Sequence, residues 1–353
     1  MSEPEVRLDQ LTGLRTILAP GRADRPAAFS PARLDPDPDA PESCPFCEGH
    51  EDRTPPEVWA DRPSGEPDAP GWRRRAVPNL YPALVGAKGI RPGVGGGPTD
   101  SGVSSGADPL RSSARVSEPD LFGSKPASGA HEVIVNSPEH LTTLAELGPE
   151  GVAAAMDAWR ARVAAHAEVA SQVHLIVHEG AAAGATLDHT HAHLYALDFF
   201  PAEIARERER MSAYHQRTMG SHLLEDVGVE EVRRRERLVT VDEEALLYCP
   251  WASRHPFAMR LLPRERSPRF DQSAGGGAML HRALVALAEL FGFSPPLNVW
   301  VRTAPRGTEE FHWYIDIAPR LEAKGGFELG TGVDINPYAP ERAAADLRGA
   351  LDV

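Results

Sequence analysis

The stretch His189-Thr190-His191-Ala192-His193-Leu194-Tyr195 carries a histidine at three alternate positions. Period-two alternation over residues 189–197 predicts a β-strand, in which alternate side chains share one face. We therefore expect the three imidazoles to project together into one cleft. The simplest interpretation is a histidine-rich metal site, because His-x-His pairs are common in zinc enzymes. A sharper one is that one histidine binds metal while the next is a nucleophile, since neutral imidazole attacks phosphorus near pH 7 and its N–P adduct is labile.

Regular patterns flank this strand, and they occur twice in the same order. Each run reads as a strand, a proline-containing turn, a helix, a strand, a loop and a strand. The expected elements are strands at 131–136, 173–178 and 189–197 around a helix at 150–170, then strands at 257–262, 297–303 and 312–317 around a helix at 278–291. We infer an α+β fold in which an internal duplication gives two halves, with antiparallel sheets, crossing helices and edge-to-edge pairing.

The two halves are expected to divide the chain at residue 200. Residues 1–200 hold the groups capable of chemistry, and residues 201–353 have largely lost them. Within the first half, residues 85–130 are rich in glycine, serine and proline and contain few large apolar groups. Such a segment cannot bury enough apolar surface to offset its chain entropy, so we expect a flexible insert. A plain linker is favoured over a lid on the substrate.

Charge and cysteine content restrict the class of protein. The 37 lysine and arginine residues face 51 acidic ones, a net charge of −14, which disfavours binding to nucleic acids or anionic membranes. No apolar run approaches the ~18 residues of a spanning helix, and no secretory signal is evident at the start. Three cysteines, two of them close together, favour a reducing cytoplasm over a disulfide framework. We expect a cytoplasmic protein, and any phosphate that it handles must be a small one held by locally gathered arginine or lysine residues.

The close cysteine pair is Cys44-Pro45-Phe46-Cys47. Such a pair chelates zinc from a tight turn or cycles as a dithiol. The redox alternative needs the pair at a helix start in a thioredoxin-like unit, which the flanking sequence does not supply. A structural or site-organising zinc is therefore favoured, with downstream histidines as the missing ligands.

Together these motifs give the chain a family resemblance. It resembles the galactose-1-phosphate uridylyltransferases of the histidine-triad superfamily, and the similar plant ADP-glucose phosphorylases, from Arg15 to about Leu347. The resemblance rests on six ordered motifs: Pro20-Gly21-Arg22-Ala23-Asp24-Arg25-Pro26, the Cys44/Cys47 pair, Asn79-Leu80-Tyr81-Pro82-Ala83-Leu84, Ser137-Pro138-Glu139-His140, the His189/His191 pair, and Gly325-Gly326-Phe327-Glu328-Leu329-Gly330-Thr331-Gly332.

The resemblance implies a zinc site and a covalent mechanism. One Zn²⁺ would be held by Cys44, Cys47, His140 and His189, and it would aim His191 rather than act as a Lewis acid. His191 would take the nucleotidyl group and release a sugar 1-phosphate, and a second phosphate compound would then attack the adduct, giving ping-pong kinetics.

The resemblance also implies contacts to the substrate. Phosphate-binding positions would be Arg22, Arg25 and Thr186, a nucleotide contact would be Asn79, and further substrate contacts would be Gly326 and Phe327. Two positions depart from the uridylyltransferase pattern, where His193 replaces a glutamine and His178 replaces an asparagine. His193 can donate to a phosphoryl oxygen and, as imidazolium, could protonate a leaving group.

A second metal site of the family is expected to be absent. Glu207 keeps one ligand position, but its partner positions hold Thr303, Tyr314 and Asp316 in place of histidines. We therefore expect one zinc, with Glu207 on a helix surface or in a salt bridge.

The expected activity is transfer of UMP from a UDP-hexose to a hexose 1-phosphate through a nucleotidyl-histidine. Phosphorolysis of a nucleotide-sugar of the ADP-glucose type, or hydrolysis of a nucleotide phosphoester, remains an alternative because of His193. A non-catalytic nucleotide-sugar-binding protein is the remaining alternative, and the resemblance also implies a possible homodimer.

Overall fold

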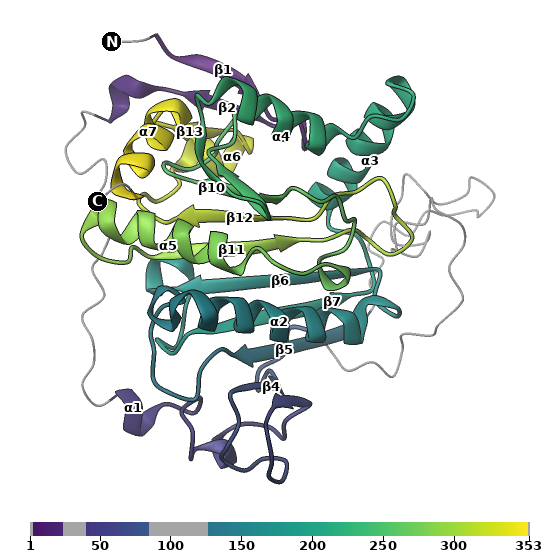
Figure 1. Ribbon diagram of the computed structural model, residues 1–353, viewed down its shortest axis with the longest axis vertical. Coiled ribbons are helices and arrows are strands. Elements are labelled where there is room, and N and C mark those ends of the chain that lie inside the picture. Colours follow the sequence, from purple (N-terminus) through teal and green to yellow (C-terminus); the bar gives the residue numbers. More distant parts are fainter. Residues whose placement is uncertain (1–2, 24–39, 85–125, 352–353) are drawn as a thin grey trace.

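The computed structural model describes residues 3–23, 40–84 and 126–351. Its centre is a ten-stranded sheet in the order β3-β4-β5-β7-β6-β11-β12-β10-β9-β8, in which every neighbouring pair is antiparallel. A three-stranded sheet, β1-β2-β13, lies at one end of the molecule (Figure 1). The strands are β1 Glu5–Leu8, β2 Arg15–Leu18, β3 Trp59–Asp61, β4 Arg74–Pro78, β5 Gly129–Val135, β6 Gln172–Glu179, β7 His191–Leu197, β8 Leu238–Val241, β9 Ala245–Tyr248, β10 Met259–Pro263, β11 Leu297–Arg302, β12 Tyr314–Pro319 and β13 Asp334–Asn336. The helices are α1 Ala40–Ser43, α2 Gly148–Ala167, α3 Ala202–Arg217, α4 Leu223–Arg234, α5 Gly277–Phe291, α6 Gly326–Thr331 and α7 Pro340–Leu351.

The strand order reads the same from both edges of the large sheet. From each edge inward come a hairpin, the strand before the long helix, the last strand of the unit and, at the centre, the strand after the helix. The two central strands, β6 and β11, pair from Glu179↔Leu297 to Leu175↔Val301. This is the α+β arrangement that an internal duplication with edge-to-edge pairing produces, whereas the division of the chain at residue 200 stays a prediction.

The long helices α2 and α5 lie side by side across one face of this sheet (Figure 1). Met156 and Trp159 of α2 and Leu284 of α5 are buried in the main core, together with Ala192 and Leu194 of β7. Because side chains alternate along a strand, the other residues of β7 point to the opposite face. No helix within the described ranges is long and apolar enough to cross a membrane.

Several elements differ from the sequence expectation at their ends by one to three residues, and two of these differences have a local physical cause. The strand expected from residue 189 begins at His191, because the Thr190 N–H donates to the Leu141 carbonyl at 2.7 Å and so bonds a loop instead of a ladder. The insert expected at 85–130 ends earlier, since Gly129 and Ala130 belong to β5. Gly129 has φ 157°, and a Cβ there would overlap the facing Ala196 carbonyl, so the start of β5 requires glycine. Residues 85–125 of the expected insert lie outside the described residues.

Candidate active site and metal centre

Four side chains from distant parts of the chain gather at one end of β7. Cys44 and Cys47 come from the turn after α1, His140 from the loop after β5 and His189 from the bend before β7. One ligand atom from each of the four lies within 4.8 Å of the others. The Cys44 Sγ and Cys47 Sγ atoms lie 3.5 and 3.7 Å from the His189 Nδ1, and the Cys47 Sγ atom lies 3.3 Å from the His140 Nδ1. This group could hold a metal ion.

The spacing and chemistry of the four donors fit zinc. In a tetrahedral site, Zn–S bonds of about 2.3 Å and Zn–N bonds of about 2.0 Å place sulfur and nitrogen about 3.5 Å apart, close to the distances found here. Burial and the neighbouring Cys44 raise the pKa of Cys47 to about 12, so a bound cation is what would hold the Cys47 sulfur as a thiolate. The other ring nitrogen of His189, Nε2, lies 2.9 Å from the Ser137 carbonyl oxygen, which orients the ring toward the cysteines.

The loop that carries the cysteines is tied to the rest of the group by backbone contacts. The Glu48 N–H donates to the Pro138 carbonyl at 3.0 Å, which joins the cysteine turn to the loop that bears His140. His50 Nδ1 lies 2.7 Å from the Cys44 carbonyl oxygen. Phe46, between the cysteines, packs edge-on against His191 with ring centroids 5.1 Å apart. The metal group and His191 therefore form one packed unit.

A second cluster of imidazoles lies on the face of β7 that α2 does not cover. His191 and His193 share this face, and the antiparallel register of β5 places His131 opposite Tyr195, diagonally next to His193. The His193 ring lies 4.9 Å from the ring of His191 and 5.4 Å from that of His131. The expectation that three histidines of 189–193 enter one cleft is thus only partly right, because His189 turns to the cysteines.

The hydrogen bonds of this cluster indicate the tautomer of each ring. The Ala83 N–H donates to His131 Nδ1 at 3.3 Å, which leaves the His131 Nε2–H to donate to His193 Nδ1 at 3.2 Å. His193 then carries its proton on Nε2, which lies 3.2 Å from His191 Nε2. His191 Nδ1–H donates to the His189 carbonyl at 2.6 Å, so its Nε2 keeps the lone pair. We call the chain of hydrogen bonds from the Ala83 N–H through His131 and His193 to His191 the relay. It leaves His191 Nε2 as the nucleophilic atom.

The electrostatics of the cluster favour neutral imidazoles. Burial lowers the pKa of His191 and His131, and burial together with the surrounding histidines lowers the pKa of His193 to about 3. At pH 7 His191 is therefore a neutral base, the form that attacks phosphorus. His193 at this pH offers a neutral N–H rather than the imidazolium acid that the sequence allowed.

Comparison with known proteins places the chain in a family. The model of the galactose-1-phosphate uridyl transferase N-terminal domain matches residues 104–201. A galactose-1-phosphate uridylyltransferase of Streptomyces lividans is 30% identical over 250 residues, which cover 64% of this chain and 70% of the relative. The chain belongs to the galactose-1-phosphate uridylyltransferase family.

Within this family, the chain is similar along its whole length to an ADP-glucose phosphorylase of Arabidopsis thaliana. The two are 29% identical over 98% of this chain and 92% of the relative. The crystal structure of an ADP-glucose phosphorylase from the same plant with bound ADP-glucose matches 98% of this chain with a TM-score of 0.74 and 26% identity. A solved uridylyltransferase structure, 20% identical with a TM-score of 0.68, shares the fold.

Some of the substrate-binding positions that the family resemblance implied lie beside the histidine cluster. Asn79, just after β4, places its Nδ2 atom 3.2 Å from His131 Nε2; because both nitrogens carry protons in the tautomer assigned above, this contact is not a hydrogen bond. His178 of β6 lies 5.5 Å from His193 between ring centroids, and its Nδ1 is 2.9 Å from the Ala183 carbonyl oxygen. Thr186 is exposed in the loop that leads to β7.

The other substrate-binding positions implied by the resemblance lie in other parts of the structure. Arg22 follows β2 and lies close enough to Glu322 for its charge to act on that carboxyl group. Gly326 and Phe327 are in α6, where the Phe327 side chain is 46% exposed. Within the described ranges, no side-chain contact joins these residues to the histidine cluster. Arg25 lies outside the described residues.

The expectation for Glu207 was wrong in its helix-surface alternative and is confirmed in its salt-bridge alternative. Its side chain is fully buried in α3 rather than on a helix surface, and its nearest cation is the Arg302 Nε at 3.9 Å. Burial raises the pKa of Glu207 to about 7. Asp316 is one of the three residues that stand where the family's second metal site has histidines. It forms a bidentate pair with Arg260 at 2.7 and 3.0 Å.

Sequence reasoning missed two residues that shape the site. His131 completes the relay, and Asn298 of β11 places its Nδ2 2.8 Å from both His178 Nδ1 and the Ala183 carbonyl oxygen. His131 lies in a segment whose strand character was evident, but the strand that pairs with it was not. The signal that could have found it is the alternation of β5, read against an antiparallel register with β7.

Proposed function

We propose that the chain is a nucleotidyltransferase that carries a nucleoside monophosphate on His191 Nε2. The observation that carries this proposal is the tautomer of His191, whose Nδ1–H is committed to the His189 carbonyl at 2.6 Å while Nε2 keeps its lone pair. A protein that only binds nucleotide-sugars has no need of an imidazole poised in this way.

The reaction then runs in two displacements at the α-phosphorus. His191 Nε2 attacks, the N–P bond forms, and the bond to the bridging oxygen breaks, so that the sugar 1-phosphate leaves. The His189 carbonyl stabilises the positive charge that develops on the ring. In this proposal the neutral Nε2–H of His193, which lies 3.2 Å from His191 Nε2 before substrate binds, turns from that lone pair to a phosphoryl oxygen as His191 attacks. An oxygen of the second phosphate compound then attacks phosphorus, and the electron pair of the N–P bond returns to Nε2.

For the second phosphate compound we propose inorganic phosphate, with ADP-glucose as the nucleotide-sugar. The support is the similarity to the Arabidopsis ADP-glucose phosphorylase over 98% of this chain and the likeness to the structure with bound ADP-glucose. Phosphorolysis would give ADP and glucose 1-phosphate.

A second candidate is the uridylyl transfer that the motifs first implied, from a UDP-hexose to a hexose 1-phosphate. The observation in its favour is the 30% identity to the Streptomyces galactose-1-phosphate uridylyltransferase. In either reaction we propose that Arg22, Arg25, Asn79, His178, Thr186, Gly326 and Phe327 contact substrate.

We further propose that Cys44, Cys47, His140 and His189 hold one zinc ion. When bound, zinc would supply fixed tetrahedral geometry and the charge that keeps the two sulfurs as thiolates. The chain itself would orient the nucleophile: the position of His189 fixes its carbonyl, and this carbonyl fixes the ring of His191.

The test is the intact mass of the protein after incubation with ADP-glucose or UDP-glucose without acceptor. We expect an adenylyl or uridylyl adduct that is absent in His191→Ala and present in the matched variant His281→Ala on α5. Discharge by phosphate supports the phosphorylase, discharge by hexose 1-phosphate the uridylyltransferase, and discharge by water alone a hydrolase. An unchanged mass with unchanged, bound nucleotide-sugar would refute covalent transfer and favour a binding protein. A His191→Ala variant that still turns over would refute the nucleophile assignment.

A further inference from the structure

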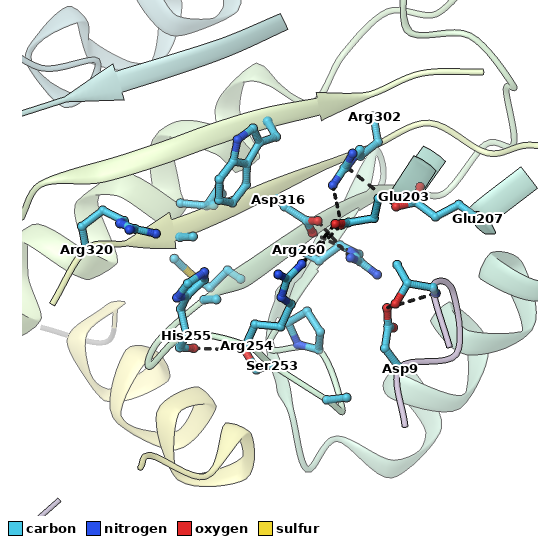
Figure 2. A pocket seen from close by; sticks show the side chains of 18 of the residues that line it. Asp9, Glu203, Glu207, Ser253, Arg254, His255, Arg260, Arg302, Asp316 and Arg320 are labelled. Atoms are coloured by element: carbon cyan, nitrogen blue, oxygen red, sulfur yellow. Dashed lines mark hydrogen bonds and ion pairs between the residues drawn. The ribbon is translucent and has the colours of Figure 1, made fainter. Parts of the chain in front are cut away.

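A cavity of about 310 Å³ lies in the half of the large sheet that does not carry the histidine cluster. It is lined by residues of β10, β11 and β12, by residues of α3 and by the loop before β10 (Figure 2). Because the strand order is symmetric, β10, β11 and β12 correspond to β5, β6 and β7, the strands that carry the histidine cluster. The volume is at the lower end of the range for pockets that bind small molecules, about 300–1,000 Å³.

The charged residues of this cavity are largely paired with one another. Arg260 is bound bidentately by Asp316, and Arg302 donates to Glu203 at 2.9 Å. Arg254 also lies against Glu203, at 3.2 Å. Because guanidinium groups cover these carboxylates, the acidic side chains do not converge as ligands for a cation. The metal-binding group found within the described ranges is the cysteine–histidine cluster alone.

One cation of the cavity is left without a carboxylate. Arg320, at the end of β12, forms no ion pair and no side-chain hydrogen bond within the ranges that the structure describes. Figure 2 shows it beside His255, on the side of the cavity away from Glu207. Lys324 also lines the cavity, and its Nζ atom lies 2.6 Å from the Asp334 carboxylate, which pairs with Arg254 as well. The Arg320 end thus has an unsatisfied guanidinium, which suits an anionic oxygen group.

The opposite end of the cavity has unused hydrogen-bonding capacity of both kinds. Both carboxyl oxygens of Glu207 are buried without a hydrogen-bond partner, and so is the Arg302 Nε–H. These groups lie 3.9 Å apart, too far to bond to each other but close enough to share a third polar atom. Burial of unpartnered polar groups costs about 1–3 kcal/mol each, so a ligand that bonds to them removes this cost.

The middle of the cavity offers an aromatic surface. Trp300 of β11 lines it and is only half-buried, on the same strand face as Arg302. Indole faces stack on the C–H faces and rings of small organic ligands, and they add apolar area to a mainly polar site. Within the described part of the chain, the cavity therefore combines an unpaired guanidinium at one end, an aromatic wall, and buried polar groups without hydrogen-bond partners at the other end.

We propose that this cavity binds a sugar phosphate, with the phosphate at Arg320, the ring against Trp300 and hydroxyl groups at Glu207 and Arg302. A sugar hydroxyl both donates and accepts, so it satisfies a carboxyl oxygen and the Arg302 Nε–H together. This site is separate from the histidine cluster and does not depend on the group transfer proposed there.

The test is calorimetric titration of the full-length protein with glucose 6-phosphate, an ester that the proposed transfer neither consumes nor produces. We expect one binding site whose affinity falls about ten- to a hundredfold in Arg320→Gln, because one charge-assisted contact is lost. Arg217→Gln removes an exposed arginine at the end of α3 and should bind as the wild type does. Trp300→Ala provides a second, uncharged variant, and thermal unfolding of each variant verifies that it is folded.

The outcomes separate the proposal from its alternatives. Loss of affinity in folded Arg320→Gln and Trp300→Ala, with Arg217→Gln unchanged, supports the sugar phosphate site. Absence of binding up to millimolar ester, or affinity that is unchanged in Arg320→Gln, would overturn it. Inorganic phosphate that binds as tightly as the ester would overturn the assignment to a sugar phosphate and leave a simple anion site.

Discussion

The relay that orients His193 toward His191 Nε2 can be tested by the substitution His131→Phe. Phenylalanine keeps the aromatic ring that stacks on Tyr195, with centroids 4.1 Å apart and an interplanar angle of 23°. It removes both ring nitrogens, so His193 Nδ1 loses the donor at 3.2 Å and the Ala83 N–H loses its acceptor. The perturbation therefore breaks hydrogen bonds while it retains most of the packing.

The magnitude follows from the one bond that orients His193. A neutral hydrogen bond contributes about 0.5–1.5 kcal/mol, which corresponds to about a two- to tenfold change in rate. Without the His131 donor, His193 can move its proton from Nε2 to Nδ1. Its Nε2 would then face His191 Nε2 lone pair to lone pair, and His191 would lose its orienting contact at 3.2 Å. We expect slower formation of the adduct with little change in KM.

Two measurements check this prediction. Single-turnover release of sugar 1-phosphate gives the rate of the first displacement, and the ¹⁵N chemical shifts of the histidine side chains give the tautomer of His193 without reference to activity. His281→Phe on α5 is the control and should leave both unchanged. A His131→Phe variant with the wild-type rate and the wild-type His193 tautomer would refute the relay.

Three further predictions concern the metal group and the core. Cys47→Ser should lose bound metal on dialysis against a chelator while Cys249→Ala keeps it, as measured by elemental analysis; retained metal in Cys47→Ser would contradict the ligand set. Glu132→Gln should cost about 3–5 kcal/mol of unfolding free energy in urea, because Arg162, bound bidentately at 2.8 and 2.9 Å, is left buried and unpaired. Although burial alone would raise it, hydrogen bonds lower the pKa of Glu132 overall. The stabilisation by Glu132 is therefore present above its unfolded pKa and is lost as the pH falls through the lower folded pKa. The free energy of unfolding of the variant should then fall less steeply with decreasing pH than that of the wild type, and an equally steep fall would contradict the pairing. Gly129→Ala should lower Tm by several degrees, since its Cβ would overlap a backbone carbonyl of β7 and its φ is 157°, and an unchanged Tm would show that β5 starts differently.

The metal group shows how far local sequence patterns reach. The spacing of Cys44 and Cys47 indicates two ligands, and alternation marks His189 as a candidate. Cys44 and His189 are 145 residues apart, however, and no periodicity specifies which histidine meets which cysteine. The set was completed only through the family resemblance, and the structure confirms that the four side chains come together.

His131 and Glu207 show where such reasoning fails. The strand that contains His131 was evident from its own residues, but its role depends on which strand lies next to it, and register is a property of two strands. Glu207 sits in the run Ala205-Arg206-Glu207-Arg208-Glu209, whose charge is typical of a solvated helix face. Its burial depends on β11, which delivers Arg302 from 95 residues away.

The large sheet explains why both ligand-binding candidates lie where they do. Helices α2 and α5 bury one face, where β7 places Ala192 and Leu194, and so the polar members of each alternating strand must gather on the other face. In the first half that face carries imidazoles whose lowered pKa values keep them neutral, as a nucleophile for phosphorus requires. In the second half the corresponding strands carry Arg260, Arg302 and Asp316, whose guanidinium and carboxylate groups are paired with each other or with Glu203 of α3, and none of these groups is a nucleophile. In the two proposals made above, the side chains of a single sheet face separate transfer of a group from recognition of a ligand.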